Sequence, residues 1–453
     1  MLTTALDRAA GARPIGENRV QLLIDGPTTY EVMLDMISRA RERIHFENYI
    51  IRSDRTGWRF AEALIARARE GVEVRVLYDW LGCVTTRGRL WRSLREAGCE
   101  VREFNPPRVL NIFATISRDH RKLIVTDGNR AVTGGLCIGD EWMGDEARGI
   151  LPWRDTGIEI AGPGATALDA AFTGTWERAG GRVSPVESRS MPALGDATVR
   201  IIAGRPGRER AYKVLEMLAA SSRERIWITD AYMVPPPRLF TAFVDAAREG
   251  VDVRMLVPGS SDVPLVRNLT RIGYRDLLRA GIRIYEWDGP MLHAKTGVAD
   301  GRWVRIGTSN LNASSLLGNY ELDVLIEDRA FALSMEEQYR RDLTHSAEVV
   351  RGRLRAPQSL QRVLPSKLAR QPPDEPPEHR QSRRERRRRA VVILWTAVTG
   401  ARRSIYGPLA LVLVALGALF LVLPRVMSGV FGVLCVWLAV AAGREAIRRR
   451  AEE

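Results

Sequence analysis

Cysteine and histidine are scarce in this chain of 453 residues, with four and five copies respectively. The cysteines, at positions 83, 99, 137 and 435, form no Cys-x-x-Cys pair and no closely spaced framework. A disulfide scaffold or a zinc site is therefore not expected. The composition is also unlike that of a disordered protein, because hydrophobic residues make up 45% of the chain and charged residues 27%. We expect two or three folded domains.

Most of the chain has little net charge. The total is +14, but residues 380–453 hold fourteen Arg and four Glu, which account for ten of those charges. Residues 1–379 therefore lack the strongly basic surface that binding along a phosphate backbone needs, and no nucleic acid is expected as a partner. For the run RQSRRERRRR at 380–389, nucleic-acid binding is the weaker alternative to a membrane role.

Two long apolar runs follow these arginines. Residues 405–423 and 426–442 are uncharged over 19 and 17 positions, close to the length that a bilayer-spanning helix needs. They predict a transmembrane helical hairpin at 405–442 with both ends cytoplasmic, because arginines flank its outer ends. A buried hairpin in a soluble core is the alternative. The remaining tail is interpreted as a Pro/Arg-rich linker at 351–389, an interfacial segment at 390–404 and a basic cytoplasmic tail at 443–453.

An internal repeat organises the body of the chain. AREGVEVRVL at 68–77 matches AREGVDVRML at 247–256 in eight of ten positions. Each copy follows a helix-like stretch and a strand-like run with a tyrosine, Tyr49 or Tyr232, and each precedes another helix and strand. Apolar strands that alternate with helices predict an α/β fold. We expect two duplicated domains, at 15–185 and 190–350.

The two copies share a polar motif at equivalent positions. DHRKLIVTDG at 119–128 and LHAKTGVADG at 292–301 both contain His-x-Lys-x-x-x-x-Asp. The candidate catalytic residues are therefore His120, Lys122, Asp127, His293, Lys295 and Asp300. Strand alternation places each His on the same face as its Lys. The aspartates come at the turn that ends each strand, where a structural role is expected.

Two imidazoles and two ammonium groups suit the chemistry of a phosphodiester. Lysines neutralise phosphate oxygens, while one neutral histidine attacks phosphorus and a protonated one delivers a proton to the leaving alkoxide. No metal or cofactor is needed for this chemistry, and none is expected. The two motifs should meet in one site between the repeats.

The paired motifs resemble those of the phospholipase D superfamily over the whole body. The flanks RDHRKLIVTDGNRAVTGGLCIGDEW, PWRDTGIEIAGP and LHAKTGVADGRWVRIGTSNLN are similar to the bacterial cardiolipin synthase branch. The resemblance implies two phospholipase D-like α-β-α sandwich domains related by a pseudo-twofold axis, followed here by the C-terminal hairpin. It also implies that His120 is the nucleophile and His293 the general acid and base.

Further site residues follow from the same resemblance. Asp155 should orient His293 and Glu321 should orient His120, each from the opposite repeat. The turns after the motifs should bind phosphate, through residues Gly134, Gly135, Ser309 and Asn310. The chain departs from the family at Cys137, which stands where the first copy would have asparagine and is a poor hydrogen-bond donor.

The function implied is phosphatidyl transfer between phospholipids, or to glycerol, through a phosphohistidine. Expected partners are phospholipid substrates such as phosphatidylglycerol or phosphatidylethanolamine, and an anionic membrane. Hydrolysis to phosphatidic acid is the alternative, and a phosphodiesterase nuclease or a non-catalytic membrane scaffold is weaker. We expect the chain at the inner (cytoplasmic) membrane, with the catalytic domain on the cytoplasmic side and the anchor at the C-terminus.

Overall fold

The computed structural model describes residues 2–107, 117–182, 193–350 and 353–354. The predicted interfacial segment, hairpin and basic tail at 390–453 lie outside these residues, as does all of the predicted linker except Arg353–Leu354. Among the described helices, none is long and apolar enough to cross a membrane.

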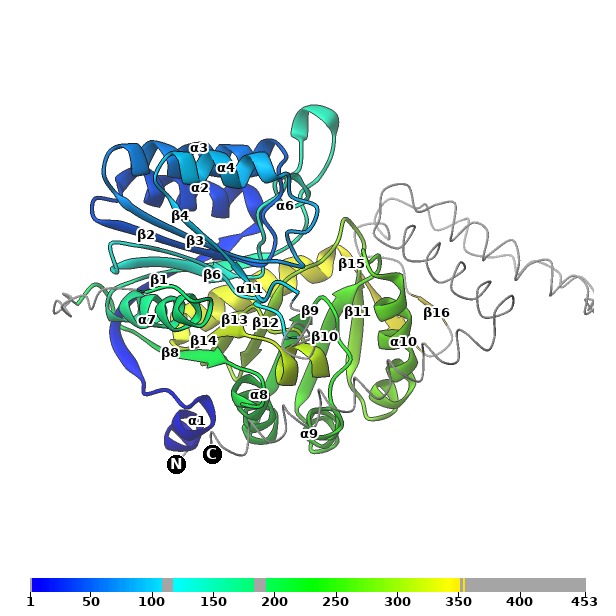
Figure 1. The fold of residues 1–453 in the computed structure, drawn as a ribbon. Helices are drawn as coiled ribbons and strands as arrows, with labels where there is room; N and C mark the ends of the chain where they lie inside the picture. Colours follow the sequence, from blue (N-terminus) through cyan, green and yellow to red (C-terminus); the bar gives the residue numbers. More distant parts are fainter. Residues whose placement is uncertain (1, 108–116, 183–192, 351–352, 355–453) are drawn as a thin grey trace, which may run out of the picture. The chain divides into compact units, whose positions relative to one another are not determined.

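The described strands form one mixed sheet in which two similar halves pair at the centre (Figure 1). The half built from the first repeat has, in spatial order, β1 (Ile15–Ile24), β7 (Thr156–Ala161), β6 (Arg130–Gly134), β5 (Lys122–Thr126), β2 (Arg43–Asn48), β3 (Glu73–Asp79) and β4 (Glu100–Phe104). The half built from the second has β8 (Ala197–Gly204), β14 (Glu321–Glu327), β13 (Trp303–Gly307), β12 (Lys295–Ala299), β9 (Arg225–Asp230), β10 (Asp252–Pro258), β11 (Arg283–Trp287), β15 (Ser346–Val350) and β16 (Arg353–Leu354). The α/β fold and the duplication predicted from the sequence are confirmed.

The strands that precede the motifs direct both histidines to one edge of the sheet. β2, β3 and β4 are parallel, and β5 runs antiparallel to β2, with Lys122 opposite Asn48. The second half repeats this arrangement, with Lys295 of β12 opposite Asp230 of β9. Each motif strand therefore begins where the neighbouring parallel strands end, which is the edge at which α/β sheets place their sites.

Helices cover the outer faces of both halves and fill the space between them. The first half packs against α2 (Asp25–Arg39), α3 (Arg55–Arg69), α4 (Gly88–Glu96) and α6 (Asp140–Met143). The second packs against α8 (Arg210–Ser221), α9 (Pro237–Arg248) and α10 (Pro264–Arg279). Between the halves, α7 (Pro163–Arg178) and α11 (Arg329–Thr344) share one core with strands of both repeats. Because strands with both faces covered must be apolar on both, runs such as RIWITD and DVRMLVP are almost continuously buried.

The N-terminal helix α1 (Leu2–Ala10) precedes the two predicted domains, which begin at residue 15, yet it packs in the core of the second half. Leu6, Ala9 and Ala10 are buried in the core that α8 and α9 build. β1 then crosses to the first half and pairs with both β7 and β8. The start of the chain therefore connects the two halves.

Candidate active site

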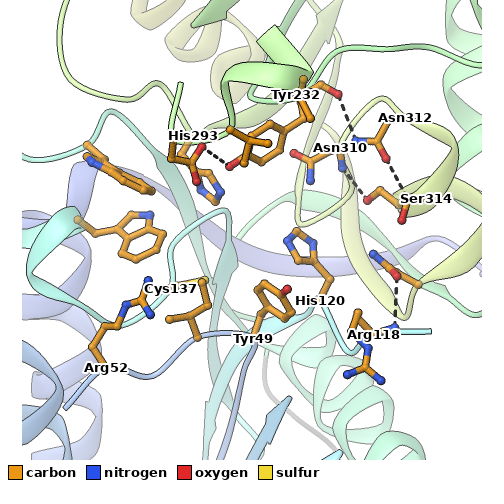
Figure 2. A pocket seen from close by; sticks show the side chains of 18 residues that line it. Tyr49, Arg52, Arg118, His120, Cys137, Tyr232, His293, Asn310, Asn312 and Ser314 are labelled. Carbon is orange, nitrogen blue, oxygen red and sulfur yellow. Dashed lines mark hydrogen bonds between the residues drawn. The ribbon is translucent and has the colours of Figure 1, made fainter. Parts of the chain in front are cut away.

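A cavity of about 420 Å³ lies between the two halves, and both motif histidines line it (Figure 2). Its other lining residues come from both repeats: Tyr49, Ile50, Arg52, Arg118, Cys137, Trp142, Trp153, Tyr232, Asp262, Val263, Val266, Asn310, Asn312, Ser314, Ser315 and Asn319. The structure thus brings together the two motifs, which are far apart in the sequence.

Backbone hydrogen bonds between the repeats fix both histidines. The His120 N–H donates to the Tyr320 carbonyl at 2.9 Å, and the His293 N–H donates to the Arg154 carbonyl at 2.7 Å. Each acceptor immediately precedes the carboxylate of the opposite repeat, Glu321 or Asp155. The same backbone contact therefore positions a histidine and its acidic partner together.

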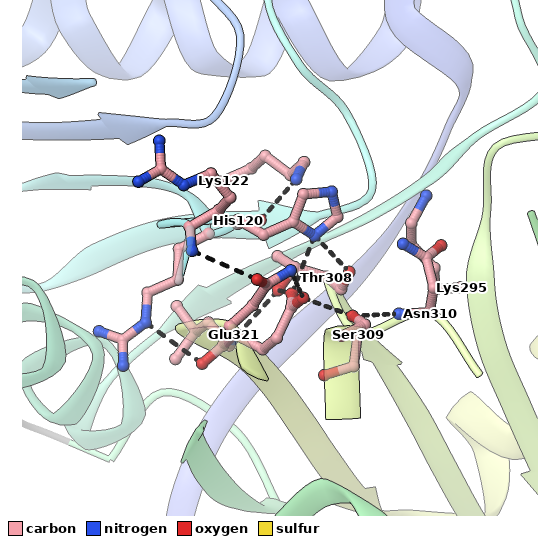
Figure 3. A network of polar contacts seen from close by, with 12 residues as sticks. His120, Lys122, Lys295, Thr308, Ser309, Asn310 and Glu321 are labelled. Carbon is pink, nitrogen blue, oxygen red and sulfur yellow. Dashed lines mark hydrogen bonds and ion pairs between the residues drawn. The ribbon is translucent and has the colours of Figure 1, made fainter. Parts of the chain in front are cut away.

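Each imidazole contacts the carboxylate that the family resemblance implied. His120 Nδ1 lies 3.0 Å from Glu321 Oε2 (Figure 3). In the second pair, His293 Nδ1 lies 2.8 Å from Asp155 Oδ2. A carboxylate accepts but does not donate, so Nδ1 carries the proton and Nε2 is left with a free lone pair. This tautomer suits a nucleophile or a general base.

Burial dominates the electrostatics of the histidines. Burial lowers the pKa of His293 to about 4. The nearby Lys295 ammonium lowers this pKa further, whereas the negative charge of Asp155 opposes the shift. Burial also lowers the pKa of His120, and Glu321 opposes this shift. Burial alone would raise the pKa of both carboxyls, but attraction to their histidines leaves the pKa of Asp155 and of Glu321 below the usual values. At neutral pH the site therefore holds neutral imidazoles on ionised carboxylates.

The two lysines lie behind the cavity wall and are fully buried. Lys122 Nζ donates to the carbonyl of His120 at 2.5 Å, and Lys295 Nζ donates to the carbonyl of His293. Burial lowers the pKa of Lys295 to about 8, although Asp155 favours its charged form. The lysines therefore supply positive charge next to the histidines without lining the cavity themselves.

The motif aspartates lie at the other ends of their strands. Asp127 and Asp300 follow β5 and β12 with φ of 51° and 49°, a left-handed conformation that Asp tolerates better than most residues. The Asp300 carboxylate accepts the backbone N–H groups of residues 223–225, and Asp127 accepts those of residues 41–43. These contacts anchor the start of β9 and of β2, and neither aspartate lines the cavity.

The glycines after the first motif make room for a carboxylate. A Cβ atom at Gly135 would lie 2.0 Å from Asp155 Oδ1. Gly134 adopts φ +149°, and a Cβ there would lie 2.4 Å from the Thr156 carbonyl. Both positions therefore require glycine to bring Asp155 beneath His293.

Two neighbouring residues of the turn after the second motif have different surroundings. Ser309 is fully buried and donates to Asp323, whereas Asn310 lines the cavity with a buried Oδ1 that has no hydrogen-bond partner. Asn310 thus presents an amide to the cavity, and its N–H groups, not the unpaired Oδ1, are the donors that a phosphate oxygen needs. Cys137 occupies the corresponding place in the first repeat, and burial raises the pKa of its thiol.

Several site residues were not predicted. Thr308 Oγ1 and Ser315 Oγ both donate to the Glu321 carboxylate and fix its orientation. The rings of Trp142, Trp153 and Tyr232 lie 5.6–6.0 Å from the His293 ring, and Trp142 Nε1 donates to Asp155. Tyr49 lies 4.8 Å from His120. The two tyrosines had a signal in their equivalent positions in the repeats, and Trp142, Trp153 and Thr308 stand in the flanks that resemble the family, although their roles were not predicted.

The imidazoles and carboxylates of the site form two separate pairs, one for each histidine. Within the parts of the chain that the structure describes, no three His, Cys, Asp or Glu side chains are placed to hold a metal ion.

Known proteins resemble this chain in sequence. The family model described as "Cardiolipin synthase, PLD-like domain" matches residues 33–141 and 214–343. A cardiolipin synthase of Alkalihalophilus pseudofirmus is 33% identical over 75% of this chain and 69% of its own length. Cardiolipin synthase A of Pseudomonas entomophila is 32% identical over 74% and 70%.

Among solved structures, a phosphatidylserine synthase of Haemophilus influenzae Rd KW20 is similar, with a TM-score of 0.61. It covers 80% of this chain and 96% of its own, at 15% sequence identity. At that identity the likeness supports the fold.

Proposed function

The chain belongs to the cardiolipin synthase family of phospholipase D-like phosphatidyltransferases, and we propose that it transfers a phosphatidyl group from one phospholipid to a hydroxyl group of another. The product from two molecules of phosphatidylglycerol would be cardiolipin and glycerol. One observation carries the proposal: two imidazoles line a single cavity, each held by a carboxylate of the opposite repeat.

The first half-reaction assigns one role to each histidine. His120 Nε2 attacks phosphorus, so that a P–N bond forms while the P–O bond to the glycerol headgroup breaks. His293, protonated once the anionic phosphodiester has entered, gives its proton to the leaving alkoxide. Glu321 and Asp155 stabilise the positive charge that develops on the two rings.

The second half-reaction reverses these roles. His293 takes the proton of the acceptor hydroxyl, which attacks phosphorus and breaks the P–N bond. His120 returns to its neutral form. Throughout, Lys122 and Lys295 offset the phosphate charge from behind the wall, and Asn310 donates to a nonbridging oxygen.

Hydrolysis to phosphatidic acid is the second candidate, since water could replace the acceptor alcohol. The wall around His293 favours transfer, because the rings of Trp142, Trp153 and Tyr232 lie next to the imidazole and offer apolar contact surface to a lipid acceptor. The acyl chains of a phospholipid acceptor can pack against such a wall, whereas water cannot.

We further propose that the enzyme works at the inner membrane, with its catalytic body on the cytoplasmic side. This rests on the two uncharged runs within 405–442 and the arginines on either side of them. Anionic phospholipids would attract that arginine-rich region.

To distinguish transfer from hydrolysis, the purified full-length chain is incubated with vesicles in which phosphatidylglycerol is the only phospholipid. Cardiolipin and glycerol in equal amounts support phosphatidyl transfer. Phosphatidic acid without cardiolipin would establish hydrolysis instead. The His293→Ala variant serves as the inactive control.

A further inference from the structure

Large apolar side chains exposed to solvent gather in three segments that border the cavity. Nine such side chains are found in the described part of the chain, and two of them, Leu194 and Leu333, lie in other segments. The seven within the three segments are Leu81, Val84, Ile150, Leu151, Leu265, Leu269 and Ile272. This clustering calls for an explanation, because exposed leucines on a soluble surface are usually scattered.

Helix α10 carries the largest share. Leu265, Leu269 and Ile272 recur at helical spacing, so they form one stripe, and they are 45–73% exposed. The opposite side of the helix is buried through Tyr274 and Leu277. At the N-terminal end Val263 and Val266 line the cavity. α10 therefore connects the wall of the active site to an exposed apolar ridge.

The equivalent segment of the first repeat shows the same property. β3 leads into α4 as β10 leads into α10, but α4 has 9 residues where α10 has 16. The first repeat has a loop, residues 80–87, in place of the extra helical turns, and Leu81 and Val84 are exposed on it. Arg52, which lines the cavity, donates to Thr85 of this loop at 3.1 Å.

The third segment, residues 144–153, is connected to the same arginine through Glu141. Arg52 Nε donates to Glu141 at 3.2 Å, and the Glu141 carbonyl accepts the N–H of Trp153 at 3.0 Å. Trp153 lines the cavity, while Ile150 and Leu151 just before it are exposed. Each of the three segments therefore contains or contacts a residue that lines the cavity.

The charged residues of α10 indicate which kind of partner these segments would contact. Of the four arginines of α10, Arg271 is paired with Glu286 and Arg279 with Asp276, while Arg275 is exposed beside the apolar stripe. An apolar stripe flanked by arginine is the pattern of a helix that lies in the interface of an anionic bilayer. A second protein seated on the same residues would close the cavity to its substrate, whereas a bilayer would deliver it.

We propose that residues 80–87, residues 144–153 and α10 form a surface that docks the mouth of the active site onto an anionic phospholipid bilayer. The proposal rests on the proposed function, since a phosphodiester in a lipid headgroup can then reach His120 and His293 while its acyl chains stay in the membrane. The docking surface belongs to the catalytic body and acts in addition to any anchor in the tail.

A fluorescent probe at Leu269 tests the docking in the full-length chain. Leu269→Cys is combined with Cys435→Ser and labelled with an environment-sensitive dye, since Cys83, Cys99 and Cys137 are buried. Vesicles of phosphatidylglycerol and phosphatidylethanolamine should shift the emission to the blue, and nitroxide-labelled lipids should quench it about twofold or more. Leu333→Cys in the same background is the matched control: it is 57% exposed and lies near the start of α11, at the end of β14 away from Glu321.

Two results would overturn the docking surface. One is an emission at position 269 that vesicles leave unchanged. The other is an emission that is already blue-shifted and unresponsive without vesicles, which would mean that a second copy or another segment covers the stripe. A response of equal size at positions 269 and 333 would count against it as well.

Activity separates this proposal from the proposed function. The triple variant Leu265→Glu, Leu269→Glu, Ile272→Glu should lose about tenfold or more of its turnover on vesicles. On short-chain phosphatidylglycerol dissolved as monomers it should match the unchanged chain. Equal turnover on vesicles would contradict docking. If the unchanged chain turns over neither substrate, the proposed function fails, while the fluorescence result still decides on docking.

Discussion

His293 Nδ1 lies 2.8 Å from Oδ2 of Asp155, a residue 138 positions earlier in the chain. The symmetric contact, His120 to Glu321, spans 201 positions in the other direction. Each repeat thus supplies the histidine of one pair and the carboxylate of the other. Neither half holds a complete site by itself, and the duplication explains how one chain completes it.

Replacing Asp155 with asparagine should slow turnover about 100-fold or more. The amide would keep the volume but lose the charge that stabilises the imidazolium form of His293 and selects its tautomer. The measurement is kcat on phosphatidylglycerol vesicles. Glu321→Gln should have a comparable effect through His120, and Asp245→Asn on α9, outside the cavity and the docking surface, is a control expected to retain activity. Full activity in Asp155→Asn would contradict the pairing.

Asp300→Asn should affect stability more than catalysis. Asparagine keeps the left-handed backbone, but its amide cannot accept all three N–H groups that the carboxylate accepts from residues 223–225. We expect a loss of about 1–3 kcal/mol in the free energy of unfolding, measured with urea, and kcat within about threefold. Asp245→Asn on α9 is the control. A large loss of kcat at unchanged stability would instead give Asp300 a catalytic role.

The contribution of His293 to the stability of the folded chain should decrease as pH falls from about 6.5 to about 4. Asp230, whose pKa burial raises to about 6, acts in the opposite direction, so the comparison with His293→Gln isolates the histidine. His293 has a pKa of about 4 in the fold and 6.5 as its ordinary value, so between these the unfolded chain binds the extra proton. The full shift corresponds to about 3 kcal/mol. Unfolding at several pH values should show a shallower decrease in His293→Gln, because glutamine does not titrate. The carboxyl of Asp155 titrates below this window. Identical slopes in both proteins would contradict the burial of a neutral ring.

The two phosphate-binding positions should differ in importance. Asn310→Ala should reduce kcat/KM about 100-fold, because it removes an amide that lines the cavity. Cys137→Ala should change kcat/KM by no more than about threefold, since a protonated, buried thiol donates weakly. Equal losses at the two positions would show that the repeats contact the phosphate symmetrically.

Much of this arrangement can be predicted from the sequence because the repeat doubles every signal. The spacing of His120 and Lys122, found again at His293 and Lys295, is enough to indicate a joint site. The turn position of Asp127 and Asp300 likewise predicts a structural role. Both predictions depend only on residues close together in the sequence, namely those of one strand and the turn that follows it.

Contacts between distant segments could not be predicted in the same way. The pairing of Asp155 with His293 was available only through family resemblance, since nothing in the spacing joins them. The packing of α1 on the second half and the central pairing of β1 with β8 depend on which surfaces meet in three dimensions. The wall of Trp142 and Trp153 had no local signal either, because buried tryptophans are common in any core.

Trapping the covalent intermediate tests the central claim most directly. The full-length chain is mixed with phosphatidylglycerol vesicles, quenched within one turnover under alkaline conditions that preserve phosphohistidine, and analysed by peptide mass spectrometry. We expect one phosphatidyl group on His120, and neither adduct nor cardiolipin in His120→Ala. Cardiolipin formed at full rate by His120→Ala, or formed without any histidine adduct in the unchanged chain, would contradict it.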